Sequence, residues 1–203
     1  MNLVQRAKNI IISPKTEWAV VANEEPNTSQ ILFSYVLPLA LIPAIAAFVG
    51  SLIFMQFSFG FAFAMGIGMA IVYFVVLFVS ILVSAFIIDA FASSFGSQKN
   101  FGRSLQLIAY SVTPAMLLGV FNFIPVLGWL LYLVGFGYGV YIMYLGLGPI
   151  KQTPEDKKVV YLVVSILVLI FLFWILFWLL TLIIIGIVTA IFGFGMMGGS
   201  FNY

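Results

Sequence analysis

The charged side chains of this chain fall in three short stretches, separated by long apolar segments. The chain has eight Lys and Arg and six Asp and Glu. They are Arg6, Lys8, Lys15, Glu17, Glu24 and Glu25, then Asp89, Lys99 and Arg103, and finally Lys151, Glu155, Asp156, Lys157 and Lys158. A charge at the centre of a bilayer costs about 2.5 to 3.5 kcal/mol on insertion scales, so segments without one can stay in lipid. The pattern therefore predicts an integral membrane protein whose polar chemistry lies on one face.

Composition excludes several classes of function. Hydrophobic residues make up 64% of the chain and charged residues 7%, whereas a soluble domain has roughly a quarter charged residues. Cys and His are absent, which removes thiol nucleophiles, imidazole bases and the usual zinc ligands. An aspartyl dyad needs a second acid beside Asp89, and a serine hydrolase needs a base. We therefore expect no enzyme, no cofactor and no metal site, and no basic run is dense enough for nucleic acid.

Five apolar stretches are long enough to cross a membrane, which takes roughly 20 residues in a helix. They cover about 31–55, 61–88, 104–123, 129–147 and 159–187. With five spans, every Lys and Arg lies on the face of the amino terminus, so the positive-inside rule predicts a cytoplasmic amino terminus and an external carboxyl terminus. The expected fold class is all-α: a polytopic membrane protein of five transmembrane helices, preceded by short amphipathic interfacial helices.

The two ends of the chain differ from the predicted membrane domain, 31–192. Residues 1–30 are expected to form a cytoplasmic amphipathic segment, because apolar residues recur there at helical spacing (Leu3, Ala7, Ile10, Ile11). A helix with such a face lies in the headgroup region. Ser13-Pro14 would start a second short helix whose Trp18 suits the interface. Residues 193–203 are predicted to be a glycine-rich external tail.

Asp89 is the acidic residue at the end of the second span, so its carboxylate is expected near the headgroups. An ionised carboxylate left alone there would cost several kcal/mol, so we expect a partner. Arg103, which opens the third span, is the predicted partner, with Lys99 as a second choice. This cluster is either a clamp on the hairpin of spans two and three or a site for a lipid headgroup or cytosolic partner, with Lys99 and Arg103 holding phosphate.

Pro114 lies about ten residues into the third span and is predicted to bend it. The hydroxyls of Ser111 and Thr113 could satisfy carbonyls freed by the proline. The bend either serves packing alone or makes Tyr110 to Pro114 the floor of a cleft open to the cytoplasm.

Small residues recur every fourth position in two spans. Ala62, Gly66 and Ala70 form such a ridge in the second span, and Gly135 and Gly139 form one in the fourth. These ridges let helix backbones approach closely. They favour packing within the monomer over an interface between copies.

Several motifs occur in an order that resembles the Yip (Ypt/Rab-interacting protein) domain family. They are SPKTEW (13–18), YVLPL (35–39), KNFGRSLQLIAYSVTP (99–114), IPVLG (124–128) and YGVYIMYLGL (138–147). The resemblance runs from about Ile10 to the last span. It implies five helices and a cytosolic amino terminus. Eukaryotic relatives bind prenylated Rab GTPases or one another and take part in vesicle traffic. The long amino-terminal region with its Asp-Leu-Tyr-Gly-Pro motif is missing here, so the chain looks like the short prokaryotic type and Rab binding is not carried over.

These features predict a non-enzymatic membrane protein of the Yip type in the plasma membrane of a prokaryote. It would organise the membrane or recruit partners through its cytoplasmic face. The alternative is a transporter, channel or lipid scramblase with a groove between helices. Membrane lipids are the expected contacts, and a second copy, another membrane protein or a cytosolic protein stay open as partners.

Overall fold

The chain folds into a bundle of helices. The computed structural model describes residues 2–54 and 58–198, with side chains as far as residue 191. Every regular element in these ranges is a helix, and none is a strand. Five helical runs among them are long and apolar enough to cross a membrane: Thr28–Phe54, Phe59–Phe95, Phe101–Phe123, Pro125–Lys151 and Glu155–Ile191. The predicted all-α class with five spans is therefore confirmed.

Three of the five spans are built from more than one helical segment. Two short helices precede them, α1 (Leu3–Ile12) and α2 (Pro14–Ala22). The first span joins α3 (Thr28–Ile31), a π-helical turn (Leu32–Val36) and α4 (Leu37–Phe54). The second is α5 (Phe59–Phe91) with a 3₁₀ turn (Ala92–Phe95). The third joins α6 (Phe101–Ser111), α7 (Thr113–Leu118) and a 3₁₀ turn (Gly119–Phe123). The last two are α8 (Pro125–Lys151) and α9 (Glu155–Gly198).

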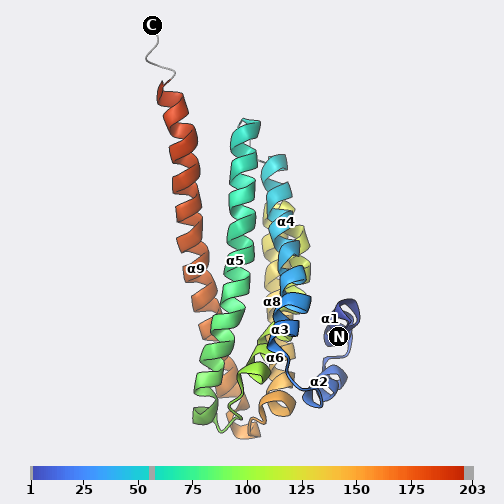
Figure 1. Cartoon of the computed structure of the whole chain (residues 1–203). Helices are drawn as coiled ribbons and strands as arrows, with labels where there is room; N and C mark the ends of the chain where they lie inside the picture. Colours follow the sequence, from blue (N-terminus) through green and yellow to red (C-terminus); the bar gives the residue numbers. More distant parts are fainter. Residues whose placement is uncertain (1, 55–57, 199–203) are drawn as a thin grey trace.

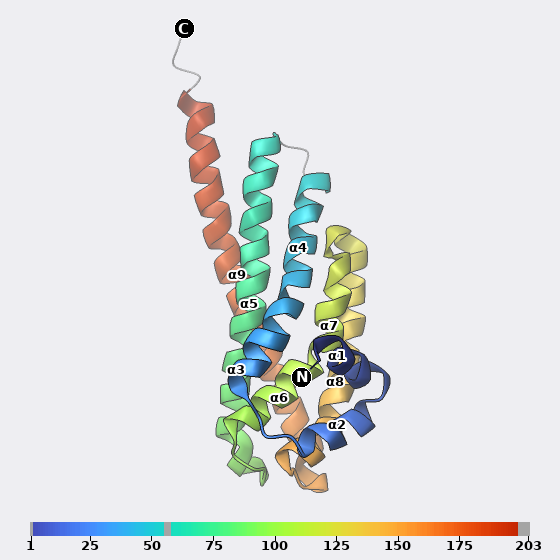
Figure 2. The ribbon, with the colours of Figure 1, turned by 45° about the vertical axis from the view of Figure 1, so that its right-hand side comes forward.

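The spans differ in how much protein surrounds them. In Figure 1, α5 stands between α9 and α4, and in Figure 2, α7 lies between α4 and α8. In the most apolar window of each span, 72% of residues are buried in the third span but only 11% in the fifth. The third span is therefore the centre of the bundle, and α9 is a peripheral helix that packs mainly on α5.

The connections after α5 and α8 meet at one end of the bundle, which we call the charged end (residues 89–104 and 151–158). The backbone N–H of Gln98 donates to the carbonyl of Lys151 at 2.7 Å. The hydroxyls of Ser97 and Thr153 are 2.9 Å apart. This end lies at the bottom of Figure 1, whereas α9 ends far from it at the top.

The small-residue ridges pack inside the chain. An ideal Cβ at Gly139 would lie 2.5 Å from the carbonyl oxygen of Ser111, and one at Gly135 would lie 2.8 Å from the Cα of Ala115. In the second span, a Cβ at Gly66 would meet the side chain of Ser51 at 2.1 Å. These glycines therefore let α8 approach the third span and α5 approach α4.

Several helix ends differ from those expected. The connection between the predicted spans 61–88 and 104–123 is shorter than expected, because α5 and a 3₁₀ turn continue to Phe95 and the side chain of Asn100 caps α6. Gly96, with φ +65°, makes the turn between them. Phe59 and Gly60 already belong to α5, and the rest of the expected turn at 56–60 lies mostly outside the described residues. The fifth helix continues to Gly198, beyond the expected end near Ile187 and into the expected tail, whose residues 199–203 lie outside the described part.

The amino-terminal helices are docked on the rest of the protein. Trp18, expected at the interface, is fully buried, and its indole N–H donates to the carbonyl of Ile142 in α8 at 2.8 Å. The hydroxyl of Tyr138 donates to the carbonyl of Ile11 at 2.6 Å. An amphipathic pattern identifies which face is apolar, but here that face packs on α6, α7 and α8 rather than on lipid alone.

Candidate polar site at the charged end

The carboxylate of Asp89 is held by three donors from different parts of the chain. Its Oδ1 accepts from Lys151 Nζ at 3.0 Å, from the backbone N–H of Asn100 at 2.7 Å and from the hydroxyl of Ser104 at 3.0 Å. Lys151 Nζ also donates to the hydroxyl of Ser104 at 2.7 Å. The lysine is fully buried and the aspartate nearly so. This buried pair joins the ends of α5 and α8 to the start of α6.

The expected pairing of Asp89 with Arg103 is wrong. The guanidinium of Arg103 donates instead to the carbonyls of Val21 and Ala22, at 2.9 and 3.0 Å. The reason is helix geometry. Successive residues of a helix point about 100° apart, so when Ser104 faces Asp89, Arg103 is turned toward the end of α2. Arg103 is therefore a cap for the last carbonyls of α2.

Lys99, the second choice, is exposed, and the ion pair of Asp89 in the described part of the chain is with Lys151. Lys99 and Arg103 also do not form a joint phosphate site, because the guanidinium of Arg103 donates to the last carbonyls of α2. Sequence reasoning missed Lys151 because it belongs to a different charged stretch. One signal was present: Lys151 directly follows the apolar Ile150, whereas the other four charges of that stretch come after Gln152, Thr153 and Pro154.

A second buried ion cluster fixes α1 to α2 and to the connection that follows. Arg6 Nη1 pairs with Glu17 Oε1 at 2.5 Å, and Arg6 Nη2 pairs with Glu24. Asn9 donates to the other oxygen of Glu17 at 2.9 Å. Burial alone would lower the pKa of Arg6, but the hydrogen bond that Arg6 donates to Glu24 and nearby negative charge raise that pKa above its ordinary value. The guanidinium lies 5.6 Å from the ring centroid of Tyr110, within the range of a cation–π contact.

The third span is interrupted at Val112, between α6 and α7, and Pro114 lies in the first turn of α7. Thr113 satisfies one carbonyl there, because its hydroxyl donates to the carbonyl of Ala109 at 3.2 Å. That hydroxyl is also 2.7 Å from the hydroxyl of Tyr35. The interruption therefore places a buried polar contact between the first and third spans.

Ser111 does not share this role. Its hydroxyl is buried and has no hydrogen-bond partner among the described residues. Ser111 and Val112 line an apolar cavity on the other side of the span, whereas Tyr110 and Pro114 do not line it. Tyr110 instead packs against Tyr35, with ring centroids 4.8 Å apart. The stretch from Tyr110 to Pro114 is therefore not the floor of one cleft, because its residues face two sides of the helix.

Chemically, these clusters hold helices together. Each charged group in them has a protein partner from a different segment of the chain. No group of three His, Cys, Asp or Glu that could hold a metal ion occurs in the described ranges.

Comparison with known proteins gives one match. The model of the Yip1 domain family matches residues 8–177, which is well over half of the 203 residues. The matched region begins in α1 and ends within α9, so it includes Asp89, Lys151, Glu17 and Glu24 but not Arg6. No match was found among curated proteins or among solved structures. The resemblance to the Yip family is confirmed: the chain belongs to the Yip1 domain family.

Proposed function

We propose that this Yip-type membrane protein is not an enzyme and that it organises the bilayer around its amino-terminal helices. One observation carries the proposal: α1 and α2 are clamped to one side of the bundle while their outer face stays apolar and basic. The side chains of Val4 and Ile12 are 72% and 67% exposed. Lys8 lies between them at helical spacing and is also exposed. This combination suits a helix lying in the headgroup region with its lysine reaching toward the phosphates.

Because α1 and α2 are docked partway along the bundle, the apolar surface available to the bilayer is shorter on their side than on the opposite side. Helix α1 is bonded to Tyr138, about 20 Å along α8 from Lys151 at about 1.5 Å per residue. Only about 20 Å of α8 lies beyond that level, between Tyr138 and Pro125. On the opposite side, α9 offers about 50 Å between Val159 and Ile191.

A bilayer with about 30 Å of hydrocarbon matches neither length. A short apolar belt is accommodated by thinning of the adjacent bilayer, and a long one by tilt or thickening. The two short helices also add cross-section only to the half of the bundle nearer the charged end. The protein would thereby bend or thin the membrane beside α1 and α2.

This function predicts that the protein gathers where the membrane is curved. With the charged end facing outward on giant vesicles, we expect several-fold enrichment on pulled membrane tubes, measured by fluorescence relative to a lipid dye. Replacing Val4 and Ile12 with Asp should reduce the enrichment to near one, because a charged face cannot enter the leaflet. The Val4→Leu, Ile12→Leu variant keeps the apolar face and is the matched control. Equal density of the native chain on tubes and on vesicles would contradict the proposal.

Recruitment of a cytosolic protein is the second candidate. Its support is a group of exposed charges at the charged end (Lys99, Glu155, Asp156 and Lys157). Unlike Asp89, Lys151 and Arg103, they lie at the surface rather than in the buried clusters. The alternative of a transporter or channel gains no support from the apolar cavity, because hydrated paths need polar lining. A lipid scramblase, whose groove needs less polar lining, stays an alternative.

The proposed orientation gives a topology prediction. The positive-inside rule places the charged end in the cytoplasm, and an odd number of spans places the end of α9 outside. Reporter fusions should therefore be active on opposite sides of the membrane, with the amino-terminal fusion cytoplasmic. Activity of both fusions in the cytoplasm would rule out this orientation.

A further inference from the structure

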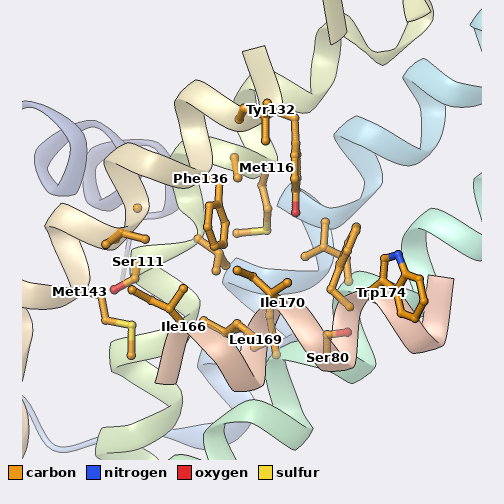
Figure 3. Close-up of a pocket in the computed structure, with 18 residues that line it drawn as sticks. Ser80, Ser111, Met116, Tyr132, Phe136, Met143, Ile166, Leu169, Ile170 and Trp174 are labelled. Carbon is orange, nitrogen blue, oxygen red and sulfur yellow. The ribbon is translucent and has the colours of Figure 1, made fainter. Parts of the chain in front are cut away.

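A cavity of about 280 Å³ lies among α5, the third span, α8 and α9 (Figure 3). It sits beside the interruption at Val112, on the opposite side of the third span from the Arg6 cluster. Gly139 brings α8 close to Ser111 at one wall of the cavity. Helix α9 forms the other wall with Ile166, Leu169 and Ile170.

The cavity is elongated and opens sideways. Its lining residues on α8 extend from Tyr132 to Met143, about 16 Å of helix at about 1.5 Å per residue. At its edge Trp174 is 62% exposed and Leu133 45% exposed. Both belong to spans whose outer surfaces face lipid. The cavity is therefore continuous with the lipid-facing surface of the bundle.

The lining selects hydrocarbon. Its polar side-chain groups are the hydroxyls of Tyr132, Ser80 and Ser111 and the indole N–H of Trp174 at its edge. The two serine hydroxyls are buried and unpaired within the described ranges. A water molecule needs two to four polar partners, and apolar cavities stay dry and bind apolar molecules instead. The surrounding bilayer supplies such a molecule at high concentration.

We propose that one acyl chain of a bilayer phospholipid lies in this cavity, along α8, and bridges α8 to α9. The elongated shape fits an extended chain better than a compact ligand. The chain fills the space between two helices that would otherwise lack packing there. The cavity lies on a different face of the bundle from α1 and α2, so the occupancy proposed here is independent of the proposed function.

The test uses photolabelling with a phosphatidylcholine that carries a diazirine in the middle of one chain. In reconstituted protein, peptide mass spectrometry should find label on the cavity residues of α8 and α9. Their labelling should exceed that of outward residues on the same helices, such as Val134 and Leu179, several-fold. Equal labelling of cavity and outward residues in the native chain would overturn the proposal, and this readout does not depend on any variant.

Two variants sharpen the result. Leu133→Trp with Ile170→Trp fills the mouth and should reduce cavity labelling several-fold. Val134→Trp with Leu179→Trp adds the same bulk on the outer surface and should leave cavity labelling unchanged. Cavity labelling that survives the mouth variant would contradict the proposal. Displacement of the label by an isoprenoid alcohol, but not by unlabelled phospholipid, would also overturn it.

Discussion

Replacing Lys151 with Met is expected to cause the largest loss of stability of any single change at the charged end. The substitution keeps most of the side-chain volume but leaves the buried carboxylate of Asp89 without its ion partner. Breaking a buried pair in this way costs about 3–5 kcal/mol. For a chain of this size, that corresponds to a fall of roughly 10 °C in the thermal transition in mild detergent.

A double-mutant cycle separates this pair from the pairing that the sequence suggested. Asp89→Asn with Lys151→Met should lose much less stability than the sum of the two single changes, because the second change removes an already unpaired group. Asp89→Asn with Arg103→Gln should be nearly additive, since Arg103 donates to α2 instead. Coupling to Arg103 as strong as that to Lys151 would contradict this assignment.

Replacing Trp18 with Ala is expected to release α1 and α2 from the bundle. Trp18 is fully buried, and an ideal Cβ on Gly146 would lie only 2.7 Å from its ring, so the indole fits closely against α8. Truncation of a buried tryptophan costs about 3–5 kcal/mol, and the hydrogen bond to Ile142 is lost as well. Because this contact lies between α2 and α8, its loss weakens the docking of the two short helices on the bundle.

Limited trypsin digestion in detergent measures that release. Cleavage after Lys8 and Lys15 should become at least ten-fold faster in the Trp18→Ala variant, because both bonds lie in helices that must unfold to be cut. Val20→Ala, an exposed change on the same helix, is the control and should leave the rate close to that of the native chain. An unchanged rate in the tryptophan variant would show that other contacts hold α1 and α2.

The fold class could be predicted from the sequence because charge is so costly in lipid. The three charged stretches and the apolar lengths between them leave little freedom in the number of spans. The partner of Asp89 could not be predicted in the same way. Three basic residues, Lys99, Arg103 and Lys151, lie near Asp89 along the chain or in space. Which of them pairs with the carboxylate depends on the rotation of α6 and on where α8 ends, and the charge pattern determines neither.

The amino-terminal segment illustrates a different limit. The spacing of Ala7 and Ile10 correctly indicates a buried face, but an apolar face packs equally well on lipid or on protein. Arg6 does not belong to this apolar spacing, yet it is buried because Glu17 and Glu24 pair with it. A sequence pattern shows what it costs to bury each residue alone. It cannot show that Arg6 and Glu17 are buried as a pair, with Glu24 beside them.

The Asp89–Lys151 ion pair and the hydrogen bond of Trp18 to Ile142 both depend on α8, and this bears on how the protein is made. Asp89 enters the membrane with the second span, well before Lys151 leaves the ribosome. Trp18 is synthesised earlier still, and its acceptor at Ile142 also belongs to α8. The nascent chain must therefore carry an unpaired carboxylate and an undocked amino-terminal segment until the fourth span is inserted. Insertion of α8 is then the step of biogenesis that allows both the ion pair of Asp89 and the docking of the amino-terminal segment to form.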